Sequence, residues 1–215
     1  MPLRLFPLAS VVLFPGQRID LRVFEPRYRL LMAECVQEGE PFGVALIREG
    51  AEVGGPAVPH DVGTLARLTG ITPTRDGMLH VTAVGTQRFR ITARDDSRPY
   101  LRAEVEPVRD EFAEVNSEVL RFARSGLVRA RELRALANGE YEREYRVPEH
   151  PGPVADAIAG QAPVEATRLQ AILETTNVSQ RLDTVLPMLD SVIAQARLAA
   201  AQAASSRWAA FGLTN

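Results

Sequence analysis

The chain has 215 residues, of which 46% are hydrophobic and 24% charged, and its formal net charge is −2. This composition is ordinary for a globular protein and excludes a largely disordered chain. No apolar run is long enough to span a membrane, and the single cysteine, Cys35, excludes an internal disulfide. We therefore expect a cytoplasmic protein.

The first hundred residues predict a β-rich domain. Ile19, Leu21 and Val23 alternate with polar residues, which indicates a strand with one buried face. Asp76-Gly77 predicts a hairpin turn, and Gly85 a bulge or bend in the strand that follows. Further strands are expected over residues 3–8, 42–47, 62–74, 79–93 and 101–105. Six or so strands of this kind fit a small closed or nearly closed barrel.

One helix is expected within this series of strands. Pro26 suits the first helical position and Gly39 can close the C-terminal end. The apolar residues of this segment repeat at helical spacing and predict one buried face. They are Tyr28, Leu31, Met32, Cys35 and Val36.

After residues 107–110 the apolar pattern becomes helical. Helices are expected from about Phe112 to Gly126, then over 127–137, 154–159 and 164–174. Asn177 predicts a cap for the last helix, in which Pro187 predicts a kink. The alanine-rich tail, with Trp208 and Phe211, is a candidate for self-association. The pattern predicts an α+β protein with a barrel over 1–109 and a helical bundle with a long C-terminal helix over 110–215.

Many short pieces of the chain resemble, in the same order, the N-terminal substrate-binding domain of Lon proteases. They include Leu5-Phe6-Pro7-Leu8, Val12-Leu13-Phe14-Pro15-Gly16, Phe24-Glu25-Pro26-Arg27-Tyr28, Phe42-Gly43-Val44 and Pro99-Tyr100. The resemblance is dense from Leu3 to Val105 and looser in the helical half. It implies a PUA-like, mostly antiparallel β-barrel with one inserted helix, then a helical bundle. It also implies recognition of polypeptide by a stand-alone form that lacks the ATPase and peptidase domains.

The absence of lysine excludes two chemistries of complete Lon proteases. All 25 residues counted as lysine or arginine are arginine. A P-loop needs a lysine on the nucleotide phosphates, and a Ser-Lys dyad needs an amine that can lose its proton, which a guanidinium cannot do. No G-x-S-x-G or H-E-x-x-H motif is present. We therefore expect no enzyme, and the hydrolase hypothesis ranks last.

No cofactor or metal is expected. The three histidines, His60, His80 and His150, are far apart, and none has a second histidine or cysteine at metal-ligand spacing. Cys35 falls on the buried face of the expected helix, where a cysteine is usually a small apolar residue and not a nucleophile.

Two neighbouring segments are candidates for polypeptide binding. Arginine forks and a carboxylate beside aromatic rings can hold a peptide carbonyl or carboxylate, and an apolar lip beside the loop 50–59 can hold unfolded segments. The candidate residues are Phe14, Pro15, Phe24, Glu25, Arg27, Tyr28 and Arg29. The alternative is structural: Glu25 at a helix N-terminus, arginines paired with barrel loops, and aromatic rings in the core.

The favoured hypothesis is a non-catalytic module that binds exposed apolar or unfolded protein segments, with a protease or chaperone as further candidate partners. An RNA-binding PUA-like protein is the alternative. Residues 1–109 carry 14 arginines and 13 acids, and residues 110–215 carry 11 and 14. Neither part is basic enough to predict a nucleic-acid surface. No membrane partner is expected, and a homo-oligomer could form through the C-terminal helix.

Overall fold

The computed structural model describes residues 2–55, 57–140 and 146–212, with side chains as far as residue 207. The chain divides into two compact units. The first comprises Met1–Asp110 and Glu165–Thr176, and the second Glu111–Val164 and Asn177–Asn215. The sequence placed a boundary near residue 110, but nothing in its pattern indicated that residues 165–176 return to the first unit.

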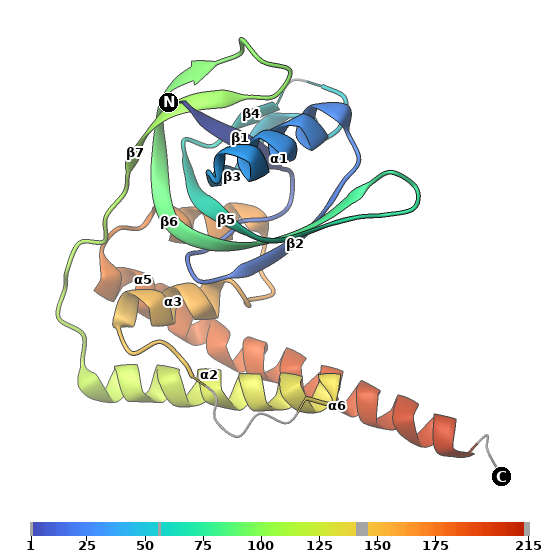
Figure 1. Ribbon diagram of the computed structural model, residues 1–215. Coiled ribbons are helices and arrows are strands. Elements are labelled where there is room, and N and C mark those ends of the chain that lie inside the picture. The colour runs from blue at the N-terminus through green and yellow to red at the C-terminus, as the bar shows by residue number, and fades with distance from the viewer. Residues whose placement is uncertain (1, 56, 141–145, 213–215) are drawn as a thin grey trace. The chain divides into compact units, whose positions relative to one another are not determined.

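The first unit is built around a sheet that closes on itself (Figure 1). Strand β1 pairs with β7 on one side and, in parallel, with β3 on the other. Antiparallel pairing of β7 with β6, β6 with β5 and β5 with β3 completes a ring of five strands. Its elements are β1 (Leu3–Leu8), β2 (Arg18–Val23), α1 (Pro26–Glu38), β3 (Phe42–Gly50), β4 (Ala57–Pro59), β5 (Val62–Pro73), β6 (Leu79–Asp95), β7 (Arg102–Pro107) and α4 (Ala166–Glu174). The expected α+β class with a mostly antiparallel barrel is confirmed.

Two strands lie outside this ring. Strand β2 pairs with β6 over Leu79 to Val84, which precede the part of β6 that pairs with β7. Strand β4 pairs with the end of β3. Strand β6 thus begins beside β2, outside the ring, and continues into the barrel. Its pairing with β5 shifts register between Thr64 and Ala66, close to Gly85.

Helix α1 covers part of the barrel core. Pro26 occupies its first turn and Gly39 closes it in the left-handed conformation, as predicted. Tyr28, Leu31, Met32 and Cys35 are buried with barrel residues in one apolar cluster. Val36, which the sequence placed on the same face, is 55% exposed. It lies about 80° from Tyr28 around the helix, at the edge of the contact face.

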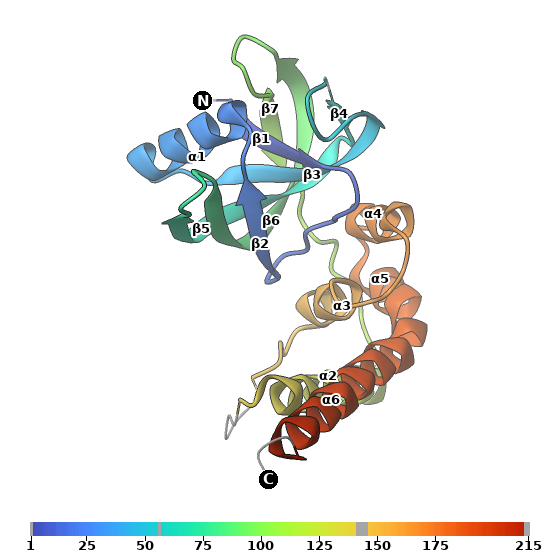
Figure 2. The ribbon, with the colours of Figure 1, turned by 90° about the vertical axis from the view of Figure 1, so that its right-hand side faces the viewer.

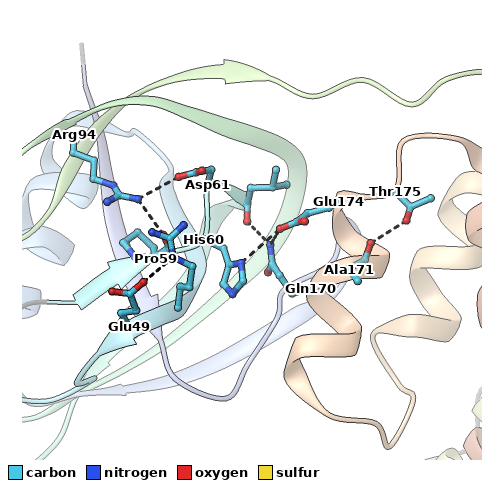
Figure 3. A network of polar contacts seen from close by, with 11 residues as sticks. Glu49, Pro59, His60, Asp61, Arg94, Gln170, Ala171, Glu174 and Thr175 are labelled. Atoms are coloured by element: carbon cyan, nitrogen blue, oxygen red, sulfur yellow. Dashed lines mark hydrogen bonds and ion pairs between the residues drawn. The ribbon is translucent and has the colours of Figure 1, made fainter.

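Helix α4 is held to the barrel by polar contacts, several of which Figure 3 shows. The Gln170 Nε2 donates to the Val62 carbonyl oxygen at 2.9 Å, and the Arg88 Nε donates to the Leu173 carbonyl oxygen at 2.9 Å. The Nδ1 of His60 lies 3.7 Å from the Glu174 carboxylate. These bonds account for the return of residues 165–176 to the first unit.

The second unit contains only helices among its described residues. They are α2 (Ser117–Asn138), α3 (Pro151–Ala159), α5 (Val178–Val185), a short 3-10 helix, η1 (Leu186–Met188), and α6 (Leu189–Gly212). Helices α2 and α6 lie side by side (Figures 1 and 2). The two helices run in the same direction. Gly126 of α2 meets Leu189 at the start of α6, and further along both helices Arg207 of α6 donates to the Leu136 carbonyl of α2.

Two expectations for this unit need correction. The helix expected from Phe112 to Gly126 begins instead after the cap Asn116 and continues through Gly126, while Phe112 is 91% exposed. Gly126 does not end the helix, because its missing side chain makes room for Leu189: a Cβ there would lie 2.4 Å from the Leu189 Cδ2. The pattern alone could not distinguish a helix end from a close helix contact.

The end of the bundle follows the sequence more closely. Asn177 caps α5 by accepting from the Gln180 N–H at 3.0 Å, as predicted. The sequence predicted a kink at Pro187 within one helix; the structure has two helices instead, α5 and α6, separated by a 3-10 turn at this position. The side chains of Trp208 and Phe211 lie outside the described part of the chain, so self-association through this helix stays a prediction. Among the described residues, no helix is both long and apolar enough to cross a membrane.

A buried ion pair lies inside this bundle. The Nε of Arg181 in α5 lies 3.2 Å from the Oδ1 of Asp156 in α3, and the two side chains are 0% and 3% exposed. Two charges at such depth require each other, because an uncompensated buried charge typically costs about 3–5 kcal/mol. The pair therefore fixes how α3 and α5 meet.

Replacing Gly85 by alanine tests the close contact beside the barrel. A Cβ at Gly85 would lie 2.4 Å from the Phe14 carbonyl oxygen, a backbone atom held by the bonds between Gly16, Gln17 and Gly85. We expect Gly85→Ala to lower the free energy of unfolding in urea by about 1–3 kcal/mol. In the control Gly70→Ala the nearest atom is 3.7 Å away, and a change within about 0.5 kcal/mol is expected. Equal losses in both variants would contradict the crowding.

Candidate functional site

A surface hollow of about 240 Å³ lies along β2. Every residue from Ile19 to Glu25 lines it, including those whose side chains point to the core and those that point to solvent. The hollow therefore follows the backbone edge of the strand and not one of its faces. The residues that line it elsewhere belong to β1, the segment between β1 and β2, α1, and the loop between β3 and β4. They include Phe6, Leu8, Val11, Tyr28, Glu52 and Val53.

The edge of β2 that borders this hollow has no strand beside it. Among the described strands, β2 pairs only with β6. A strand directs its N–H and C=O groups alternately to its two sides, so an edge strand presents a row of backbone groups without strand partners. Such an edge can accept a further strand from another chain.

Apolar side chains gather around the same hollow. Val11, Phe24 and Val53 are 39%, 52% and 57% exposed, although all three are large hydrophobic residues. They come from three separate segments of the chain. Clustered exposed apolar side chains rimmed by polar ones mark sites of interaction more often than scattered single residues do.

The loop that carries Val53 is held by the joint between β2 and α1. The Glu25 carboxylate accepts from Arg27 at 3.0 Å and from the Gly54 N–H at 3.3 Å. The two Nη atoms of Arg27 donate to the carbonyl oxygens of Glu52 and Gly55, both at 3.3 Å. At the other side of the loop, the Glu52 carboxylate accepts from the Ala9 N–H at 3.0 Å. The rim of the hollow is thus fixed by a set of bonds within the unit.

Tyr28 lies beneath this joint. The Arg27 guanidinium lies 4.5 Å from the centre of its ring, within the range of a cation–π contact. Tyr28 is only 5% exposed, and burial raises the pKa of its phenol above the ordinary value. Tyr28 therefore forms the neutral floor of the hollow.

The structure distributes the seven candidate residues among different roles. Phe24 is exposed at the hollow, and Arg29 is exposed on α1. Glu25 and Arg27 fix the loop, which is the structural alternative considered from the sequence. Phe14 is fully buried and offers no surface to a partner, while Pro15 is half-buried at its turn.

The sequence predicted that Phe14 and Pro15 lie beside the loop 50–59, but the contacts of the loop are with other residues. The loop bonds Ala9, Glu25 and Arg27, whereas the Phe14 carbonyl lies against Gly85. Val11 and Val53 were missed, because single valines in connecting segments carry no periodic signal. Only the closure of the barrel brings them to Phe24.

The described residues include no group of three or more histidine, cysteine or acidic side chains that could hold a metal ion. Cys35 is 1% exposed, and burial raises the pKa of its thiol to about 11. The thiolate is the reactive form of cysteine. Cys35 therefore acts as an apolar core residue at neutral pH.

Comparison with known proteins agrees with this architecture. A family model described as the ATP-dependent protease La (LON) substrate-binding domain matches residues 2–191. The chain belongs to this family. A crystal structure of a Lon N-terminal domain protein from Xanthomonas campestris is 30% identical, with a TM-score of 0.67, and covers 87% of this chain and 98% of that one. The N-terminal domain of a Mycobacterium avium complex Lon protease shares the fold, with a TM-score of 0.61 at 18% identity.

Complete Lon proteases are also similar to this substrate-binding domain. Lon protease 2 of Myxococcus xanthus is 30% identical over 196 residues, which are 87% of this chain and 23% of the relative. Lon protease of Paraburkholderia phytofirmans is 32% identical over 208 residues, which are 92% and 25%. The chain thus spans about a quarter of the length of these curated relatives. None of these matches supports the RNA-binding alternative.

Thiol chemistry tests the burial of Cys35. Near pH 8 the raised pKa leaves about a hundredfold less thiolate than an unperturbed cysteine has. We therefore expect a disulfide reagent to modify the native protein at least about a hundredfold more slowly than the urea-unfolded chain. The rate should rise tenfold per pH unit up to the folded pKa near 11. Fast modification at pH 8 without unfolding would show that the thiol is accessible and ionised.

Proposed function

We propose that this Lon substrate-binding domain binds exposed apolar segments of unfolded or partly unfolded polypeptide, without chemical conversion, in the hollow along β2. The observation that carries the proposal is the juxtaposition of an unpaired strand edge with the exposed ring of Phe24. The family's description as a substrate-binding domain supports the general role. The hollow along β2 is the surface that we propose for it.

The strand edge selects for extended chain. An incoming segment gains main-chain hydrogen bonds with β2 only if its own N–H and C=O groups are free. Helices and inner strands already use those groups, so a folded protein offers few of them, mainly at exposed strand edges and in loops. Selection of unfolded over folded polypeptide follows from this geometry and needs no particular sequence in the client.

The apolar hollow supplies affinity and a preference for side chains. Its volume of about 240 Å³ suits one or two large apolar side chains, and each one buried contributes roughly 1.5–3 kcal/mol. Alternate side chains of an extended segment point the same way. We therefore propose that the preferred segments carry apolar residues at alternate positions.

The charges at the hollow are largely paired with each other. Asp20 pairs with Arg18 and Glu25 pairs with Arg27. This leaves little net field to attract a polyanion, whose binding would show a strong dependence on salt. A lysine-free chain also supplies no Ser-Lys dyad, which supports binding over cleavage. We keep the cytoplasm as the proposed location and a protease or chaperone as proposed recipients of the bound client.

A substitution at Phe24 tests the proposed surface. We expect Phe24→Ser to weaken binding of a fluorescent, reduced and carboxymethylated client protein about tenfold, near 1.4 kcal/mol, with little change in the urea midpoint because the ring is 52% exposed. Phe112→Ser is the matched control, since Phe112 is also exposed, at 91%, and does not line the hollow. Fluorescence anisotropy measures both. Equal affinity for the native and denatured client, or equal losses in both variants, would contradict the proposal.

A peptide comparison tests the binding mode separately. A six-residue peptide with alternating leucine and serine is titrated beside an analogue N-methylated at alternate residues on one edge, and beside a second analogue methylated on the other edge. Addition to β2 uses one edge of the peptide, so we expect one analogue to lose at least about tenfold in affinity and the other to retain most of it. Equal affinity of all three peptides would contradict strand addition and would mean that the peptide binds through apolar contacts alone.

A further inference from the structure

A second hollow, of about 270 Å³, lies within the helical unit. Three arginines line it: Arg131 and Arg134 from α2, and Arg146 from the segment before α3. Its remaining wall is largely apolar and includes Leu127, Val147 and Ala157. The site is separate from the hollow along β2 and does not depend on the proposed function.

Arg134 is the most informative of the three. It is half-buried, and its guanidinium donates to the Gln161 Oε1. No carboxylate lies within ion-pair distance of it among the residues that the structure describes. Burial lowers the pKa of this arginine, because the charged form loses part of its hydration. A half-buried cation of this kind is suited to bind an anion.

The surroundings of the hollow are held in place. Arg124 donates to the Pro148 carbonyl at 3.0 Å and Arg131 to the Arg146 carbonyl at 3.0 Å. The Gln161 Nε2 donates to the Ala157 carbonyl, which directs its Oε1 to Arg134. The side chain of Arg146 is exposed and forms no ion pair within the described ranges. Arg134 and Arg146, which have no carboxylate partner among the described residues, therefore border one hollow.

We propose that this hollow binds a carboxylate joined to an apolar side chain, with Arg134 and Arg146 on the carboxylate and the apolar wall around the side chain. A guanidinium matches the two oxygens of a carboxylate with paired donors. The apolar wall distinguishes such a ligand from a bare anion. The same chemistry occurs at the C-terminus of a polypeptide that ends in an apolar residue and in a free acylated amino acid.

Calorimetry on the full chain tests the proposal with N-acetyl-leucine as the probe. N-acetyl-leucinamide removes the charge and inorganic phosphate removes the apolar group, so each should bind at least about tenfold more weakly. A pentapeptide ending in leucine that binds more tightly than N-acetyl-leucine identifies a polypeptide terminus as the source, and a weaker one identifies a small molecule. Equal binding of the acid and its amide, or no heat with N-acetyl-leucine up to about 10 mM, would overturn the proposal.

Variants then locate the site. Arg134→Gln and Arg146→Gln should each weaken N-acetyl-leucine binding about tenfold or more. Arg129→Gln is the matched control on α2, because Arg129 is 58% exposed, pairs with Glu132 and does not line the hollow; it should leave binding unchanged. Arg146 is exposed, so its variant keeps the test valid if Arg134→Gln unfolds the protein. Unchanged binding in Arg146→Gln would overturn the assignment to this hollow.

Discussion

The pairing of β1 on both of its edges is the constraint on which the rest of the first unit depends. By joining β7 on one side and β3 on the other, β1 completes a ring of five strands. No position is left in that ring for β2, although β2 follows β1 directly in the chain. It can pair only with the part of β6 that extends beyond the barrel. The unpaired edge of β2, and the hollow beside it, are thus consequences of barrel closure.

An open strand edge beside apolar side chains favours aggregation, and proteins usually protect such edges. Here the edge is confined to the six residues of β2. The Glu25–Arg27 pair holds the neighbouring loop so that Val53 stays beside Phe24 and Tyr28. The apolar area is therefore kept small, shaped and bordered by polar groups. The same bonds explain how a charged sequence at the start of α1 supports the proposed apolar site: it fixes the loop that carries Val53.

Local features of the sequence predicted local structure well. The alternation around Leu21 and the helix signals at Pro26 and Gly39 depend on neighbours in the chain, and each is present in the structure. Gly126 shows where such reasoning fails, because its role is set by Leu189, 63 positions away in the chain. The position of α4 was unpredictable for the same reason, since Gln170 and Leu173 bond groups of β5 and β6.

For the candidate site, the structure places some of the predicted residues at the hollow along β2 and others away from it. Phe24 and the charged joint after it were recognised from their clustering in sequence. Phe14 was included as part of an apolar lip beside the loop 50–59, yet its ring is fully buried. Val11 and Val53 could not have been found without the fold, since their proximity is created by the barrel. The arginines of the helical unit belong to no motif, and only the approach of the segment before α3 brings them to one hollow.

The attachment of α4 to the barrel also determines how this protein can be taken apart. The polypeptide leaves the first unit after Asp110, returns at Glu165 and leaves again after Thr176. A fragment that ends at Asp110 would lack α4, whose Leu173 carbonyl accepts from Arg88. Arg88 is only 4% exposed and would lose this hydrogen bond. Domain exchange between relatives must therefore carry residues 165–176 with the barrel. Neither unit can be transferred as one continuous segment, because each consists of two separate stretches of the chain.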